Sequence, residues 1–523
     1  MTDDDDRDDT SNDDSGGGAR GGGGGGGGAG LLGLLFFAVR HPKITLVLVV
    51  IGGLFYLFGG GGSHFGDEPR TPSVSKPSKD EQTSDQLGTG ATLDPKVYDE
   101  ALVHEATVED AMPSRVSLRE YAPPRRSQGH QGSCVGWATS YAARSILKAR
   151  EDGQRPAATV FSPSFVYNQV GRPDCNGTYV VRALELMQKT GDLPLDEFPY
   201  DQDSCSHRPD REEKAEASRN RIAGFARLSL DGDDYRTNTL AVKQHLVQQA
   251  PVVIGMQVGG TFEEMRGKEV WHPTRDDYAL RGSWGGHAMA VIGYDDTLEG
   301  GAFEVMNSWG PAFGRDGIFF VKYRDFDHFV KEAYGLYPMG APKPGDEALH
   351  LRLGLLESAT KKHLPMSAQG DRTFRTARPI KVGTRFKVEV STTQPIYMYL
   401  FGEETDGTSY VLFPYTPKHS AYCGTTGTRV FPRKQSLTAD DKGTRDSIAV
   451  VVSSKELDFK ALNEHITQAT GASYGEKLKA AVGRDLDTKL NARVDGEVVV
   501  LDVEAAALAR RQVQAMVLEF DKR

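Results

Sequence analysis

Three residues that lie far apart in the chain have the types needed for nucleophilic catalysis. Cys134 ends a Gln-Gly-Ser-Cys run, His287 lies within Gly-Gly-His-Ala, and Asn307 opens Asn-Ser-Trp-Gly. A thiol with a pKa near ~8.5 needs a cationic neighbour or a helix N-terminus to become a thiolate. His287 would supply the cation and later protonate a leaving amine, and Asn307 would hold the imidazole ring in place. This combination predicts the chemistry of a cysteine-type peptidase.

Gln128 is a fourth candidate catalytic residue. It lies six residues before Cys134 in the sequence. Its side-chain amide could donate an N–H to the oxyanion that forms during attack, together with the backbone N–H of Cys134. Removing one such donor typically lowers the rate by about 10²- to 10³-fold. We therefore expect the catalytic set Cys134, His287, Asn307 and Gln128.

A helix over residues 134–150 should position the thiol. This stretch contains no Pro and one early Gly, and it ends in basic residues, as helices often do. Cys134 would then lie in the first turn, where the helix dipole favours negative charge. The apolar residues near helical spacing are Val135, Trp137, Ala138, Tyr141, Ala142 and Ile146.

At these motifs the chain resembles the papain-like cysteine peptidases, and the resemblance covers residues 113–341. It rests on Gln128-Gly129, Gly132-Ser133-Cys134, Gly286-His287 and Asn307-Ser308-Trp309-Gly310, which occur in the family's order. The resemblance implies an α+β, two-lobed protease fold, with the cysteine helix in a helical lobe and the histidine strand in a β-rich lobe. It implies hydrolysis of peptide or protein substrates through a thioester acyl-enzyme.

Two residues beside the nucleophile depart from the family pattern. Gln131 stands where the family has a cysteine, and Val135 stands where it has an aromatic residue. The first change leaves Cys175 without its usual disulfide partner. A bridge between Cys175 and Cys205 is possible in an oxidising compartment, and two free thiols are the alternative. No role is assigned to Cys423.

Other protein classes use similar residues. A catalytically inactive papain-fold scaffold or binding protein would keep the motifs, and a transglutaminase-like acyl transferase would also order Cys before His. A zinc site is not expected, because the chain contains no Cys-x-x-Cys or His-x-x-x-His pair. We expect no metal and no cofactor.

The N-terminal region is expected to lie outside any globular domain. Residues 1–30 are Asp-rich and then Gly-rich, which predicts a disordered tail. Residues 31–62 contain a long uncharged apolar run that predicts a single-pass transmembrane anchor. A cleaved signal peptide and a core helix are the alternatives. Arg40 and Lys43 precede the run, which favours an extracytoplasmic peptidase domain.

The remaining chain of this 523-residue protein divides into a linker and a second domain. Residues 63–112 are rich in Ser, Pro, Lys and Asp and predict a flexible linker. Residues 345–523 predict a C-terminal β-rich accessory domain, which resembles an uncharacterised domain found behind bacterial peptidases; its partner is unknown. The net charge of −10 argues against nucleic acid as a partner.

Local patterns in both domains predict further elements. Helices are expected at residues 179–189, 240–249, 456–469 and 474–482. Strands are expected at residues 252–256, 288–292, 318–321, 385–390, 396–401, 410–413, 447–453 and 513–520.

Overall fold

The structure is a computed structural model that describes most of the chain after residue 87. The tail and anchor expected at residues 1–30 and 31–62 lie outside the described residues. Within the described part, no helix is both long and apolar enough to cross a membrane. The described residues are 88–103, 112–228, 236–337, 348–370, 372–423, 428–433, 435–504, 506–507, 510 and 513–523.

An antiparallel sheet forms the β-rich part of the first body. Its strands run in the order β2-β7-β3-β4-β5-β6, and β1 pairs with β4. The three strands expected here from apolar runs are present as β3, β4 and β6. The bounds are β1 Arg115–Ser117, β2 Gly224–Arg227, β3 Val252–Gly259, β4 Trp284–Asp295, β5 Ala302–Met306, β6 Ile318–Lys322 and β7 Val330–Tyr337.

The helix expected at residues 134–150 is present and begins at the cysteine. It consists of α4 (Cys134–Gly136), a π-helical segment η2 (Trp137–Arg144) and α5 (Ser145–Asp152). It ends at a left-handed glycine, as helices commonly do. The π segment was not expected. The Thr139 hydroxyl donates to the Val135 carbonyl over 2.7 Å, which is the carbonyl that an α-helix reserves for a backbone N–H.

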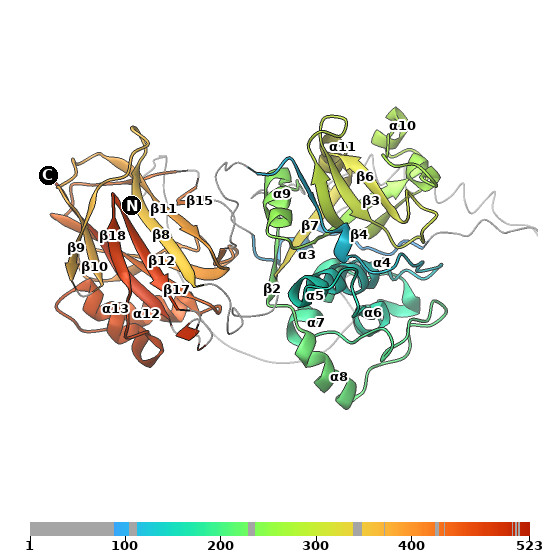
Figure 1. The fold of residues 1–523 in the computed structure, drawn as a ribbon, viewed down its shortest axis with the longest axis horizontal. Coiled ribbons are helices and arrows are strands. Elements are labelled where there is room, and N and C mark those ends of the chain that lie inside the picture. The colour runs from blue at the N-terminus through green and yellow to red at the C-terminus, as the bar shows by residue number, and fades with distance from the viewer. Residues whose placement is uncertain are drawn as a thin grey trace, which may run out of the picture. The chain divides into compact units, whose positions relative to one another are not determined.

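Two further helices, α6 and α7, lie beside the cysteine helix. Figure 1 shows α5, α6 and α7 gathered in one layer, with β3, β4, β6 and β7 in another. Helices α7 and α9 match the expected ranges. The bounds are α3 Pro95–Tyr98, α6 Pro163–Val170, α7 Val180–Lys189, α8 Arg211–Ala217, α9 Thr239–Val247, α10 Arg275–Tyr278 and α11 Tyr323–Phe329.

One apolar cluster joins the cysteine helix to the sheet. It contains Val135 and Leu147 from the helix, Leu184 from α7, and Val253 and Ala288 from β3 and β4. Because these side chains exclude water from both layers at once, their packing fixes the helix N-terminus against β4. The α+β arrangement predicted from the sequence is therefore present, with Cys134 on the helical side and His287 on β4.

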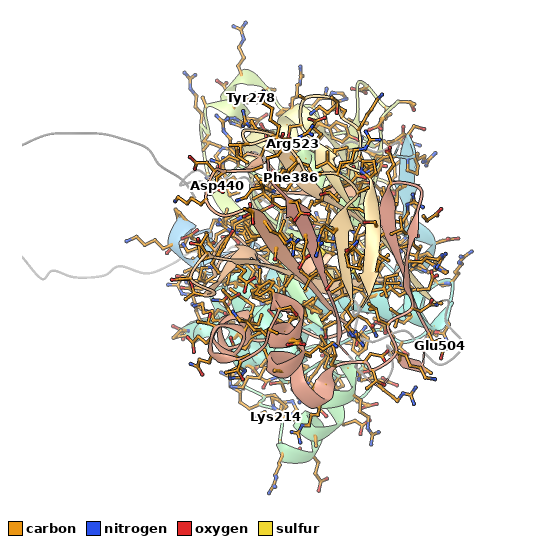
Figure 2. The ribbon with its side chains drawn as sticks, turned by 90° about the vertical axis from the view of Figure 1, so that its left-hand side faces the viewer. Lys214, Tyr278, Phe386, Asp440, Glu504 and Arg523 are labelled. Atoms are coloured by element: carbon orange, nitrogen blue, oxygen red, sulfur yellow. A yellow bond between two sulfur atoms is a disulfide. The ribbon has the colours of Figure 1, made fainter. Side chains whose placement is uncertain are left out.

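The C-terminal body contains two sheets with a shared apolar core. One has the order β13-β12-β17-β20-β10-β9 with β14 added, and the other has β15-β11-β8-β19-β18 with β16 added. Side chains from both sheets form one buried cluster, which makes this body a β-sandwich. Phe386, labelled in Figure 2, packs edge-on against Phe520 in this core.

Every element expected in this body is present. Helices α12 and α13 pack against the outer face of the first sheet. The bounds are β8 Leu349–Glu357, β9 Met366–Gly370, β10 Thr373–Thr376, β11 Arg385–Thr392, β12 Ile396–Glu403, β13 Ser409–Phe413, β14 Tyr422–Cys423, β15 Thr428–Phe431, β16 Leu437–Thr438, β17 Arg445–Ser453, α12 Phe459–Gln468, α13 Tyr474–Val482, β18 Ala492–Asp495, β19 Val498–Val503 and β20 Gln514–Asp521.

Candidate active site

The imidazole of His287 is held by Asn307. The Nε2 atom of His287 lies 2.8 Å from Oδ1 of Asn307, and both side chains are buried. Because the amide oxygen accepts only, this contact places a ring proton on Nε2. The other ring nitrogen, Nδ1, has no hydrogen-bond partner within the described part of the chain. That nitrogen is therefore left to exchange a proton with another group.

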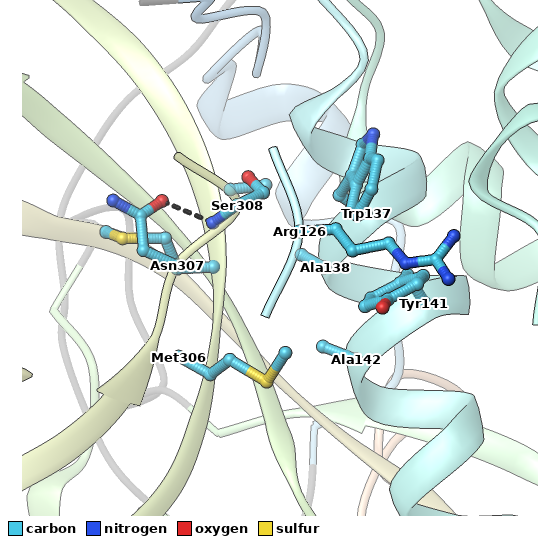
Figure 3. Close-up of a pocket in the computed structure, with 10 residues that line it drawn as sticks. Arg126, Trp137, Ala138, Tyr141, Ala142, Met306, Asn307 and Ser308 are labelled. Carbon is cyan, nitrogen blue, oxygen red and sulfur yellow. Dashed lines mark hydrogen bonds between the residues drawn. The ribbon is translucent and has the colours of Figure 1, made fainter. Parts of the chain in front are cut away.

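The thiol of Cys134 lies beside β4, next to the position of His287. The backbone N–H of Ala288, the residue after His287, donates to Sγ of Cys134 over 3.4 Å. Figure 3 shows the neighbouring pocket, which is lined by Asn307 and Ser308 on one side and by Trp137 and Ala138 of the cysteine helix on the other. The end of β5 and the first turns of the cysteine helix thus meet at one place.

Gln128 connects the cysteine loop to the asparagine loop. Its Oε1 accepts from the Ser308 hydroxyl over 2.6 Å, and its Nε2 donates to the Gln131 carbonyl over 2.8 Å. Its backbone N–H also donates to the Ser308 carbonyl over 2.8 Å. All four residues predicted from the sequence therefore lie in one buried group. The group is held by hydrogen bonds that cross between the two layers.

Trp309 is part of the site, although no role followed from the sequence. Its indole ring stacks on the His287 ring with centroids 4.4 Å apart and an interplanar angle of 30°. The indole covers one face of the imidazole while Asn307 holds its edge. The Asn-Ser-Trp-Gly motif contained the signal, but on sequence alone the tryptophan could equally have belonged to a turn.

Burial controls the charge state of the site. It raises the pKa of the Cys134 thiol to about 11, against smaller opposing effects of backbone N–H groups that include Ala288. It lowers the pKa of His287 to about 4, against the opposing hydrogen bond that His287 donates to Asn307. Burial therefore favours the neutral forms of the thiol and the imidazole. This effect opposes the thiolate that the helix dipole is expected to favour.

The cysteine pairing is decided by the structure. Cys175 and Cys205 form a disulfide, whereas Cys134 and Cys423 are buried cysteines outside any disulfide. The bridge left open by the sequence is therefore present. Among the described residues, no group of three or more His, Cys, Asp or Glu side chains has a metal-binding arrangement.

Each of the two bodies matches a known protein-family model. Residues 112–336 match the model of the papain family cysteine proteases, and residues 380–456 match a domain of unknown function, DUF4384. The first body thus matches the papain family of cysteine proteases, and part of the β-rich body matches a second family. Both resemblances stated from the sequence are confirmed.

The individual relatives have low sequence identity to this chain. A cysteine protease of Blomia tropicalis is 25% identical over 38% of this chain and 56% of its own length. Cathepsin K of Mus musculus is 23% identical over 44% of this chain and 67% of its own length. The crystal structure of xylellain, a cysteine protease from Xylella fastidiosa, is 22% identical over 51% of this chain and 100% of that chain, with a TM-score of 0.39. This chain thus matches little more than half of the length of the Blomia tropicalis protease.

Proposed function

We propose that the protein is a cysteine peptidase that hydrolyses peptide bonds through a thioester on Cys134. The observation that carries the proposal is the orientation of His287, whose Nε2 is bound to Asn307 and whose Nδ1 has no partner in the described chain. A thiol beside β4 and an imidazole with one available nitrogen are the minimum needed for proton transfer to and from sulfur.

Each residue has a distinct role in the proposed reaction. Nδ1 of His287 takes the thiol proton while Sγ of Cys134 attacks the substrate carbonyl carbon. The imidazolium then protonates the leaving amine, which leaves a thioester. A water molecule attacks this thioester after giving a proton to His287, and the carboxylic product departs as the thiol is restored. Gln128 would donate to the oxyanion, and Asn307 would keep the ring oriented.

The test is replacement of the nucleophile in the full chain. Cys134→Ala should abolish hydrolysis of a casein or fluorogenic peptide substrate while leaving the melting temperature close to that of the wild type. Cys423→Ala is the matched control, because Cys423 is the other buried cysteine that is not in a disulfide. It should retain full activity. Activity that survives in Cys134→Ala would refute the assigned nucleophile.

The same assay separates the alternatives. An inactive papain-fold scaffold would show no hydrolysis in the wild type under any condition that exposes the thiol. A transglutaminase-like acyl transferase would incorporate an added amine into the peptide instead of releasing free acid. Net hydrolysis that depends on Cys134 supports the peptidase, which uses water as its acyl acceptor.

We also propose that residues 31–62 anchor the protein in a membrane with the peptidase domain outside the cytoplasm. The uncharged apolar run and the disulfide, a feature typical of oxidising compartments, support this proposal. Leu46→Asp with Val50→Asp should release the protein from membranes washed with alkaline carbonate. The control pair Ser75→Asp and Ser78→Asp should leave it bound. Quantitative release of the wild type would contradict the anchor.

We propose further that the chain divides into a peptidase domain at residues 113–341 and an accessory domain at residues 345–523. The papain-family match at residues 112–336 begins one residue before the first range and ends inside it, and the second family match, at residues 380–456, falls within the second range. Limited proteolysis should therefore cut first between residues 338 and 347. Initial cleavage inside the sandwich would argue against this division.

A further inference from the structure

A pocket of about 800 Å³ opens beside the strand position of His287. Gln257 of β3 lines this pocket and pairs across the sheet with Gly286, the residue before His287. Leu93 lines it as well, and a Cβ built on Gly286 would lie 3.1 Å from Cγ of Leu93. One end of the pocket therefore lies at the residue next to the proposed acid–base group.

Most of the ionisable side chains that line this pocket, here called the basic pocket, are basic. They are Arg236, which precedes α9, Arg324 and His328 of α11, and Lys331 of β7. Asp327 is the one carboxylate among the described residues that line it. With His328 neutral, three cations against one anion give a formal charge of +2, whereas the whole chain carries −10. The basic pocket is therefore a site of local positive charge on an acidic protein.

Two neighbouring carboxyl groups do not line the basic pocket. Oδ1 of the buried Asp325 accepts from the Tyr278 hydroxyl and, over 3.2 Å, from Nε of Arg324. Burial raises the pKa of Glu332 to about 8, so its protonated form predominates near pH 7. Asp325 thus offsets part of the charge of Arg324, and Glu332 adds little negative charge. The net charge at the pocket remains positive.

Lys331 and His328 are held in place at the wall of the pocket. Nζ of Lys331 donates to the His328 carbonyl over 2.6 Å, and the His328 ring lies against the Tyr278 ring with centroids 4.7 Å apart. Burial lowers the pKa of the half-buried Lys331, against an opposing effect of Asp327. A partly desolvated ammonium group binds an anion more strongly than an exposed one does, because less water screens it. Lys331 is therefore a favourable partner for a carboxylate that enters the pocket.

A peptide bound at Cys134 would bring one of its side chains to this pocket. Successive side chains of an extended peptide point in opposite directions and lie about 3.3 Å apart along the chain. Neighbouring positions of β4 alternate in the same way, so the positions of His287 and Gly286 face opposite sides of the strand. A substrate residue close to the scissile bond would therefore extend past Gly286 while the bond itself stays at Cys134.

We propose that the basic pocket selects an acidic side chain of the peptide substrate, at a position close to the scissile bond. The inference rests on the proposed function and names a class of substrate for it. A Glu or Asp carboxylate would accept hydrogen bonds from Nζ of Lys331 and from the guanidinium of Arg324, and charge-assisted hydrogen bonds are stronger than neutral ones. A Lys or Arg side chain at the same position would meet like charges. The pocket thus combines attraction of one class of side chain with repulsion of another, which is how specificity arises.

The test uses the full-length protein and fluorogenic peptides that differ at one position. Glu, Gln or Lys is placed in turn at each position on both sides of the scissile bond. At one of these positions, Glu should give a kcat/KM about tenfold above that of Gln, with Lys below both. Arg324→Gln with Lys331→Gln should bring the Glu-to-Gln ratio close to one. Arg324→Glu with Lys331→Glu should make Lys the preferred residue.

Arg219→Gln with Lys214→Gln is the matched control. It removes the same two charges, from exposed positions in α8 and just after it. This variant should keep the preference for Glu. Loss of the preference in the control would show that the net charge of the protein, and not the basic pocket, selects the substrate.

Binding and hydrolysis separate this inference from the proposed function. Cys134→Ala should bind a fluorescein-labelled Glu peptide about tenfold more tightly than the Gln peptide, as measured by fluorescence anisotropy. Such binding without any hydrolysis by the wild type would support the basic pocket and overturn the proposed peptidase. Hydrolysis with equal kcat/KM for the Glu, Gln and Lys peptides at every position would overturn the basic pocket and leave the peptidase intact. A preference for Glu that survives Arg324→Gln with Lys331→Gln would likewise overturn the basic pocket.

Discussion

At the scale of single residues, His287 is oriented by two neighbours of different kinds. Asn307 accepts from Nε2 over 2.8 Å and so selects the tautomer, while Trp309 stacks on the ring with centroids 4.4 Å apart. The hydrogen bond determines which nitrogen carries the proton, and the indole limits rotation of the ring. Neither neighbour takes part in proton transfer itself.

These separate roles predict unequal effects of substitution. His287→Ala should lower kcat by about 10²- to 10⁴-fold, because it removes the acid–base group. Asn307→Ala should lower kcat less, because Trp309 still restrains the ring. Steady-state kinetics with full-length variants would measure both. Asn463→Ala, which removes a half-buried amide from α12, should have no effect on kcat. A negligible loss in both His287→Ala and Asn307→Ala would remove the pair from the mechanism.

At the scale of elements, the disulfide loop supports the nucleophile loop. A Cβ on Gly132 would lie 2.9 Å from both the Cys175 carbonyl oxygen and the Gly177 nitrogen, so the two loops are in close backbone contact. The bridge to Cys205 closes a loop with a sequence separation of 30. Closing such a loop restricts the unfolded chain and thereby stabilises the folded one.

Loss of the bridge should therefore destabilise the peptidase domain. We expect Cys205→Ser to lower its free energy of unfolding by about 3 kcal/mol, as a loop of this length implies in the chain-entropy description. Urea unfolding followed by tryptophan fluorescence would measure the shift. Dithiothreitol should produce a similar shift in the wild type and none in Cys205→Ser. A wild type that is insensitive to reduction would show that the bridge adds no stability.

At the scale of the whole molecule, burial of neutral histidines links stability to pH. Burial lowers the pKa of both His245 and His287 from 6.5 to about 4. Below pH 6.5 the unfolded chain binds protons at these rings that the folded chain does not, so protonation favours unfolding. The contribution of each ring is complete above pH 6.5 and is lost as the pH falls toward 4.

Acid should therefore lower the melting temperature over this range. For each histidine ring, the free energy of unfolding should fall by on the order of 3 kcal/mol by pH 4, because the pKa of the ring differs by about 2.5 between the unfolded and folded states. Differential scanning calorimetry between pH 7 and pH 4 would record the decline. His245→Gln should flatten the decline, and His130→Gln should not, since His130 is exposed. A melting temperature constant between pH 6.5 and pH 4 would contradict this linkage.

The sequence alone indicated the candidate catalytic residues, the helix at residues 134–150 and eight of the described strands, because each is encoded by local spacing and apolar periodicity. It also indicated a β-rich C-terminal domain, since the strands of that domain are separately apolar. The Cys175–Cys205 pairing stayed open, because distance in space is not encoded in spacing along the chain. The π turn at Thr139 was missed because a side-chain hydroxyl competes there for a backbone carbonyl.

Only the tertiary structure decided what covers the thiol and which charges it permits. Residues 88–93 belong to a stretch whose composition predicts a flexible linker, yet they are hydrogen-bonded to Gly286 and Thr178. These partners come from distant parts of the chain, and their match depends on backbone approaches that no local pattern records. The preference of Cys134 and His287 for their neutral forms follows from the same packing, because desolvation depends on every atom around a group and not on its neighbours in sequence.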